Sequence, residues 1–212
     1  MRSTQVLFAA MLAAAVPVSA AAQVQAEIGP FIGYRFGGSL ADNASTSYGI
    51  ESAVSYGAVV DLDLWRDLGV ELLWSHQGTE LPLRDVLEPG PFTVTADHWM
   101  VGPWKTFGRP AARVRPFASF LLGVSQFSTD IAEGESRARF ALGSGVGVKF
   151  FPQPRVGLRL EGRGFFTFTD GGTNLFCSAA LNACPLRFKS DLLAQGELAA
   201  SVIVVLGPLR RR

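Results

Sequence analysis

The stretch Ala138-Arg139-Phe140-Ala141-Leu142-Gly143-Ser144-Gly145-Val146-Gly147-Val148-Lys149-Phe150 decides how this chain folds. Its even-numbered residues are apolar or small, whereas its odd-numbered residues are glycine, alanine and two cations. Successive side chains of a β-strand point to opposite faces, so this alternation indicates a strand with one apolar face and one polar face.

The same two-residue period continues through almost the whole chain on both sides of this stretch. It predicts eight strands, at about 24–37, 53–65, 68–78, 93–107, 113–127, 137–151, 155–168 and 191–206. The connections alternate between long or medium (38–52, 79–92, 128–136, 169–190) and short (65–67, 108–112, 152–154). This rhythm is typical of a bacterial outer-membrane barrel, with long outer loops and short periplasmic turns. An even strand count places both ends of the barrel chain on the periplasmic side.

The two faces differ in charge. In all eight segments the even positions carry no Asp, Glu, Lys or Arg. Apart from the first residue of each segment, the odd face carries seven acids and seven bases, the balance that a lumen filled with ion pairs requires. The predicted lumen ion-pair network is Glu27, Arg35, Asp61, Asp63, Glu71, Asp97, Lys105, Arg115, Arg139, Lys149, Arg159, Glu161, Arg163 and Glu197.

Glycine distinguishes an inside-out barrel from a soluble one, whose apolar face points inward. The odd face mixes its charges with many glycines, which weaken a solvent-facing strand. In a narrow lumen, small residues leave room for long Arg and Glu side chains. The sequence therefore predicts an all-β fold, an eight-stranded antiparallel transmembrane β-barrel with its even face toward lipid. The expected aromatic girdles are Tyr34, Phe36, Trp74 and Phe168 at one rim, and Trp65, Trp104 and Phe150 at the other.

Composition excludes several other classes of protein. The 212 residues are 48% hydrophobic and 17% charged, which excludes intrinsic disorder. After the N-terminus no run of ~18 apolar residues occurs, so a helical membrane span is not expected. The formal net charge of +1 offers no electrostatic footprint for nucleic acid.

Residues 1–22 have the pattern of a secretory signal peptide. Arg2 precedes a short apolar stretch from Val6 to Val18, and the small residues 19–22 give a cleavage site before Gln23. We therefore expect an exported barrel domain over residues 23–212. Removal of 1–22 takes away Arg2 and no acid, which leaves 18 bases and 18 acids.

The two cysteines, Cys177 and Cys184, lie in the last long connection. Export favours a small disulfide that staples this loop, and the chain-entropy argument gives such a ring about 2.5 kcal/mol. Free thiols and a metal site remain the alternatives, although both histidines are far away in sequence.

Three motifs invite a chemical interpretation. The glycines at 143, 145 and 147 fall on one face of one strand, whereas a dinucleotide site needs a turn and a helix. His76 and His98 have no hydroxyl neighbour on their own strand faces, so a lipid-modifying enzyme is only a third hypothesis. Arg159-x-Glu161-x-Arg163 either belongs to the paired lumen or selects a permeating solute.

Four stretches carry a resemblance to a known family. They are Val101-Gly102-Pro103, Val114-Arg115-Pro116-Phe117-Ala118 with Leu122-Gly123, 140–147, and Val156-Gly157-Leu158-Arg159. In order and spacing the chain resembles the outer-membrane protein β-barrel domain family, the eight-stranded group that includes the barrel of outer-membrane protein A. The resemblance implies an integral protein of the Gram-negative outer membrane, inserted by the barrel assembly machinery, usually monomeric, with no catalytic site and no cofactor. Such barrels commonly end on an aromatic residue, whereas this strand ends at Leu206-Gly207-Pro208 before a basic tail.

We expect a structural and surface-interacting protein that plugs its lumen with side chains and presents four outer loops to an extracellular ligand. The alternative is a porin-like channel for small solutes through the lumen.

Overall fold

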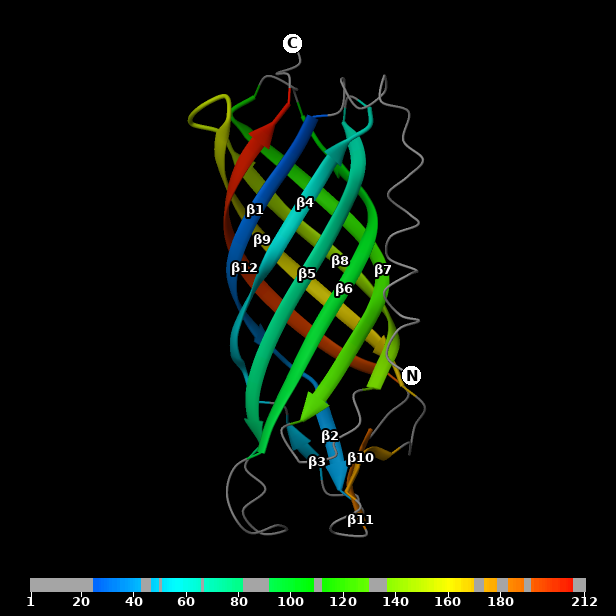
Figure 1. Cartoon of the computed structure of the whole chain (residues 1–212). Coiled ribbons are helices and arrows are strands. Elements are labelled where there is room, and N and C mark those ends of the chain that lie inside the picture. Colours follow the sequence, from blue (N-terminus) through cyan, green and yellow to red (C-terminus); the bar gives the residue numbers. More distant parts are fainter. Residues whose placement is uncertain are drawn as a thin grey trace, which may run out of the picture.

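Eight long strands close into one antiparallel barrel in this computed structural model, in the order β1-β12-β9-β8-β7-β6-β5-β4 (Figure 1). The structure describes residues 25–42, 47–49, 51–65, 67–81, 92–108, 112–129, 137–169, 174–178, 183–188 and 192–207. The barrel strands are β1 (Gln25–Phe36), β4 (Ala53–Asp63), β5 (Leu68–Leu81), β6 (Phe92–Thr106), β7 (Val114–Thr129), β8 (Arg137–Phe150), β9 (Val156–Phe168) and β12 (Leu192–Leu206).

The eight predicted strands are confirmed, with ends that differ by at most a few residues. The largest difference is in β5, which continues to Leu81 instead of ending at residue 78. Ala26 pairs with Leu206, so β1 begins and β12 ends at the same mouth of the barrel. Among the described residues, no helix is long and apolar enough to cross a membrane.

A second, four-stranded sheet lies beyond the opposite mouth of the barrel (Figure 1). Its strands are β2 (Ser39–Asp42), β3 (Ser47–Gly49), β10 (Asn174–Ser178) and β11 (Ala183–Phe188), in the order β10-β11-β2-β3. The pairing of β11 with β2, for example Arg187 with Ala41, joins the first and last long connections. The sequence predicts only loops here. The β11–β2 pairing joins segments far apart in the chain, whereas β2–β3 and β10–β11 are short local hairpins.

Two sequence predictions fall on residues that are not described in full. Cys177 lies in β10 and Cys184 in the neighbouring strand β11, but their side chains are outside the described part of the structure. The disulfide therefore stays a prediction. The signal peptide at 1–22 also lies outside the described residues.

The barrel is apolar outside and charged inside in seven of its strands. On the outer wall Ile32, Val146 and Leu198 are 63%, 66% and 62% exposed. On the inner wall the charged side chains of Glu71 and Lys149 are almost fully buried. In these seven strands the odd positions face the lumen, as the sequence predicts.

Strand β6 is the exception, and here the predicted face assignment is wrong. Opposed residues of an antiparallel pair share a face. Leu73 of β5 pairs with Met100 of β6, and His98 of β6 pairs with Ser125 of β7, so odd positions oppose even ones on both sides of β6. The other six interfaces of the barrel pair odd with odd. The two connections that flank β6 therefore shift its numbering by one residue, and its even positions face the lumen.

This reversal corrects four side-chain placements. Asp97 and Lys105, predicted in the lumen network, lie on the outer wall. His98 and Trp104, predicted to face lipid, are buried in the lumen at 0% and 4% exposure. One signal in the sequence could have revealed the reversal. The lumen glycines of the other strands are odd, whereas the single glycine of β6, Gly102, is even and buried.

Candidate functional site

The lumen contains a continuous chain of ion pairs that starts from the predicted triplet on β9. Arg159, Glu161 and Arg163 are spaced by two residues, so they share the lumen face. Glu161 Oε2 accepts hydrogen bonds from Arg159 Nε at 2.8 Å and from Arg163 Nη2 at 2.7 Å. Arg163 Nη1 in turn lies 2.9 Å from Glu197 Oε1 on β12.

The chain of ion pairs continues from the triplet in both directions. Toward the end of β1, Glu197 Oε2 accepts a bond from Arg35 Nη2 at 2.9 Å. In the other direction, Arg159 donates to Asp61 Oδ2 at 2.7 Å and to Glu71 Oε2 at 2.6 Å. Lys149 Nζ then lies 2.6 Å from both Asp61 and Glu27. Every member is nearly inaccessible to solvent, so these charges are tolerable only because they are paired.

We call this chain the lumen network. Its members are Glu27, Arg35, Asp61, Glu71, Lys149, Arg159, Glu161, Arg163 and Glu197. Three further predicted residues also face inward, nearer the mouths, namely Asp63, Arg115 and Arg139. The structure does not bring Asp97 or Lys105 to the network, because both lie on the outer face of β6.

An apolar layer that the sequence does not predict crosses the same lumen. We call it the apolar ring, and each of the eight barrel strands supplies one residue. They are Phe31, Val59, Leu73, Met100, Leu121, Ala141, Phe165 and Ala199. Arg163 lies over the Phe31 ring at 4.3 Å, and Arg35 lies 5.0 Å from the centre of Phe165. These cation–π contacts join the ring to the lumen network.

Gly145 shows how glycine makes room in this interior. A Cβ at Gly145 would lie 2.5 Å from Glu161 Oε1 and 2.7 Å from Ser119 Oγ. Both oxygens are buried and have no hydrogen-bond partner within the described protein. Two polar atoms that converge on a small space form a suitable position for water.

A buried hydroxyl–imidazole pair also lies in the lumen. His98 Nδ1 is 2.6 Å from Ser125 Oγ, which is 2.8 Å from Thr167 Oγ1, and the imidazole stacks on Phe165 at 4.2 Å. The sequence predicts no partner for His98, because its alternation pattern places this residue on the opposite face. His98 and Ser125 are both 0% exposed, so no substrate reaches this pair in the structure.

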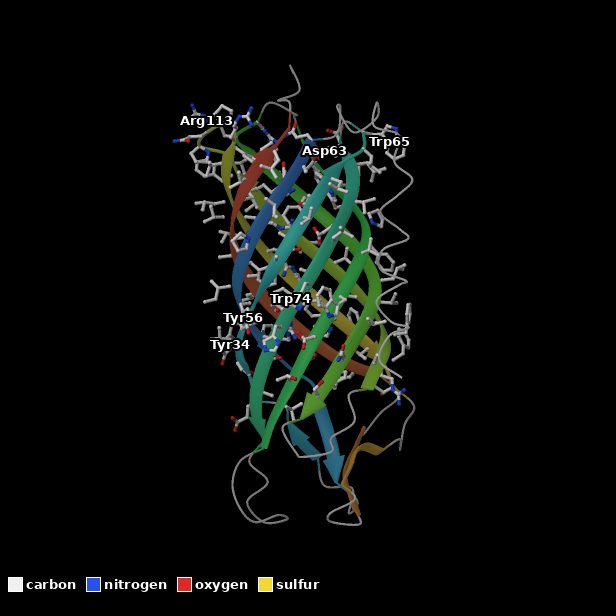
Figure 2. The ribbon with its side chains drawn as sticks, viewed as in Figure 1. Tyr34, Tyr56, Asp63, Trp65, Trp74 and Arg113 are labelled. Atoms are coloured by element: carbon white, nitrogen blue, oxygen red, sulfur yellow. The ribbon has the colours of Figure 1, made fainter. Side chains whose placement is uncertain are left out.

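The outer wall carries aromatic residues near both ends of the barrel (Figure 2). Tyr34, Tyr56 and Trp74 lie in the half nearer the four-stranded sheet, and Trp65 lies at the opposite end. The exposed side chains of Phe36, Phe168, Trp65 and Phe150 agree with the predicted girdles. Trp104 does not belong to a girdle, because it is buried in the lumen.

The outer wall also carries a polar group among these rings. Asp97 Oδ1 accepts a hydrogen bond from Trp74 Nε1 at 3.2 Å and lies 2.9 Å from His76 Nδ1. The sequence predicts no partner for His76, because the partner comes from β6, where the faces are reversed.

No protein-family model matches the chain, and no curated protein matches it. Solved structures do. Neisserial surface protein A superposes with a TM-score of 0.56 at 15% identity, over 84% of this chain and 96% of that chain. Outer membrane protein OprG from Pseudomonas aeruginosa gives 0.56 at 9% identity, over 87% and 96%. Outer membrane protein AlkL, determined in DMPC lipid bilayers, gives 0.50 at 9% identity, over 88% and 92%.

These similarities concern the backbone, since the identities are low. The closed eight-stranded topology, the inverted distribution of polar and apolar side chains and the structural matches agree with one another. The chain therefore has the fold of the eight-stranded bacterial outer-membrane barrels, as its sequence predicts.

Proposed function

We propose that this chain is an integral protein of a Gram-negative outer membrane, closes its lumen with its own side chains and acts through its outer loops. The observation that carries the proposal is the inverted barrel wall. Exposed aliphatic residues such as Ile32, Val146 and Leu198 cover its outside, and the lumen network fills its inside. Exposing such an apolar wall to water would be unfavourable, whereas the hydrocarbon of a membrane would accommodate it.

The closed lumen is supported by two layers of contact. The apolar ring takes a residue from every strand, so it spans the full cross-section of the barrel. The lumen network lies against the ring and is held by charge-assisted bonds of 2.6–2.9 Å. An eight-stranded barrel has an interior just wide enough for side chains to fill, so these layers would block solutes.

The surface role is supported by the four-stranded sheet beyond one mouth. Strands β2, β3, β10 and β11 are paired with one another, so the first and last long connections form one projecting unit. Loops held in this way on a rigid scaffold commonly carry binding functions. In this proposal the chain is exported with cleavage of residues 1–22, inserted by the barrel assembly machinery and monomeric, and the projecting unit is stapled by Cys177 and Cys184.

A channel is the second candidate, and buried polar atoms favour it. Asp61 Oδ1, Glu71 Oε1 and Glu161 Oε1 have no hydrogen-bond partner within the described protein. Buried polar groups of this kind are usually satisfied by water, so part of the lumen would be wet. A wet lumen is the starting point for a small-solute pathway.

Planar-bilayer conductance of the purified full chain separates the two candidates. We expect no steady openings from the wild type. The double variant Phe31→Ala/Phe165→Ala removes the two largest side chains of the apolar ring and should conduct. Steady openings from the wild type would overturn the closed lumen. Purification of a folded protein without detergent would overturn the membrane location itself.

A further inference from the structure

The outer wall carries a carboxylate at a depth where the membrane has its outer interface. Asp97 lies on the outer face of β6, with a side chain that is 23% exposed. Counting from Leu68 to His76 along the tilted strand β5, at ~3.3 Å per residue, places the pair about 20 Å from the β4–β5 turn. Because the apolar band of such barrels is ~25 Å tall, Asp97 lies near its outer edge.

Two of its hydrogen bonds share one carboxylate oxygen. Trp74 Nε1 and His76 Nδ1 both bond to Oδ1. A carboxylate oxygen only accepts, so the Nδ1 atom of His76 carries the proton of that bond. The basic side chain bonded to Asp97 is the imidazole of His76, and Gln126 of β7 lies directly opposite Asp97 in the neighbouring strand.

Exposed aromatic rings lie beside this carboxylate on the outer wall. Trp74 and Trp99 lie with ring centres 5.8 Å apart, and Tyr56 meets Trp74 edge-on at 6.1 Å. Tyr56 also packs on His76 at 4.9 Å. Tyr56 and Trp99 are 52% and 54% exposed, so they remain open to a ligand. A carboxylate among Trp and Tyr rings is the arrangement that recognises ammonium groups, through ion pairing and cation–π attraction.

We propose that Asp97, Tyr56, Trp74 and Trp99 form a binding site for the ammonium headgroup of a membrane lipid. The lipid amine would donate to the Asp97 carboxylate and lie against the exposed aromatic rings, while its acyl chains follow the apolar wall below. The occupant is a lipid because the site opens toward the bilayer and lies at headgroup depth. The proposal rests on membrane insertion and is independent of what the outer loops bind.

Native mass spectrometry of the full chain in mixed micelles tests this site. The two probes are dimyristoyl phosphatidylethanolamine and its N-acetyl derivative, which has the same chains and phosphate but no ammonium. We expect the wild type to retain the amine lipid at least about fivefold more than the N-acetyl lipid. Free ethanolamine should compete weakly, because it lacks the chains that the wall would hold.

Four variants locate the effect. Asp97→Asn should abolish the preference, and Trp99→Leu should reduce it. His76→Asn keeps a donor to Asp97 without a basic group and should retain the preference. The control Thr95→Val removes a polar group next to Asp97 on the same face and should leave the preference unchanged. Heat-modifiable migration in detergent gels reports whether each variant is folded.

Each remaining outcome overturns the proposal. Equal retention of both lipids by the folded wild type would mean that the site does not recognise the ammonium group. Persistence of the preference in folded Asp97→Asn would mean that the amine binds elsewhere. A chain that folds without detergent would instead contradict membrane insertion, so failure of the site and failure of the proposed location give different results.

Discussion

Strands β6 and β8 each carry a lysine at an odd position, and the two lysines lie on opposite sides of the barrel wall. Lys149 of β8 is buried between Glu27 and Asp61, whereas Lys105 of β6 is exposed on the outer face. In both strands the odd positions carry the charged residues. The difference shows that alternation within a strand defines two faces but does not decide which face is inside.

The connections that flank a strand decide whether its odd-numbered or its even-numbered residues face the lumen. Adding or removing one residue between two strands moves every side chain of the second strand to the other face. The pairs Leu81–Phe92 and Thr106–Phe117 each enclose an even number of residues. The odd positions of β6 therefore face the opposite side of the barrel wall from the odd positions of the other strands. Asp97 lies on the outer wall because of this register.

The largest expected effect comes from replacing the two lysines in turn. Lys149→Met leaves Glu27 and Asp61 buried without their shared cation and should lower the free energy of unfolding by about 3–5 kcal/mol. Lys105→Met removes an exposed charge and should change it by less than about 0.5 kcal/mol. Urea titration in lipid vesicles measures both. Equal losses of unfolding free energy would mean that the two lysines lie on the same side of the barrel wall.

Arginine on the outer wall should have the next largest effect. Val146→Arg in β8 and Val101→Arg in β6 each place a charge toward lipid and should cost about 2–4 kcal/mol near the midplane. Val146 is even and Val101 is odd, so equal penalties are expected only if β6 is reversed. If Val101→Arg were harmless in the same titration while Val146→Arg was not, residue 101 would face the lumen.

Two glycines on opposite sides of the barrel wall provide a comparison with smaller expected changes in stability. Gly145→Ala adds a methyl group against Glu161 and Ser119 in the lumen, and overpacking there should cost about 1 kcal/mol. Gly162 lies in a groove on the outer wall, where the nearest atom to a Cβ is Leu198 Cδ2 at 3.6 Å. Gly162→Ala should therefore be neutral or stabilising by up to ~1 kcal/mol. The reverse ranking in equilibrium unfolding would contradict the inward position of Gly145.

The smallest perturbation tests β6 by fluorescence. Trp99 faces outward and Trp104 lies in the lumen. In vesicles that contain brominated lipid, Trp99→Phe should remove quenchable emission, whereas Trp104→Phe should remove emission that the lipid does not quench. Neither substitution changes the charge of the wall. The opposite result would restore the face assignment that the sequence predicts for β6.

Much of this protein is determined locally and can be predicted from its sequence. The alternation in 138–150 and its repeats give the strands, the inverted wall and the inward glycines, because the side chains of a strand alternate whatever its neighbours are. The triplet Arg159, Glu161 and Arg163 is predicted in the lumen for the same reason. The resemblance to outer-membrane barrels follows from the order of these segments, and the structure confirms the fold.

Other features depend on contacts between distant segments, which only the tertiary structure supplies. The register at both edges of β6 moves Asp97 outward to His76 and His98 inward to Ser125. The stagger of the strands brings Phe31, Leu73 and Phe165 to one level as an apolar ring, although odd positions are expected to be polar. The pairing of β11 with β2 joins loops from opposite ends of the sequence. Alternation thus gives each strand its two faces, and strand register and closure of the barrel decide how those faces combine.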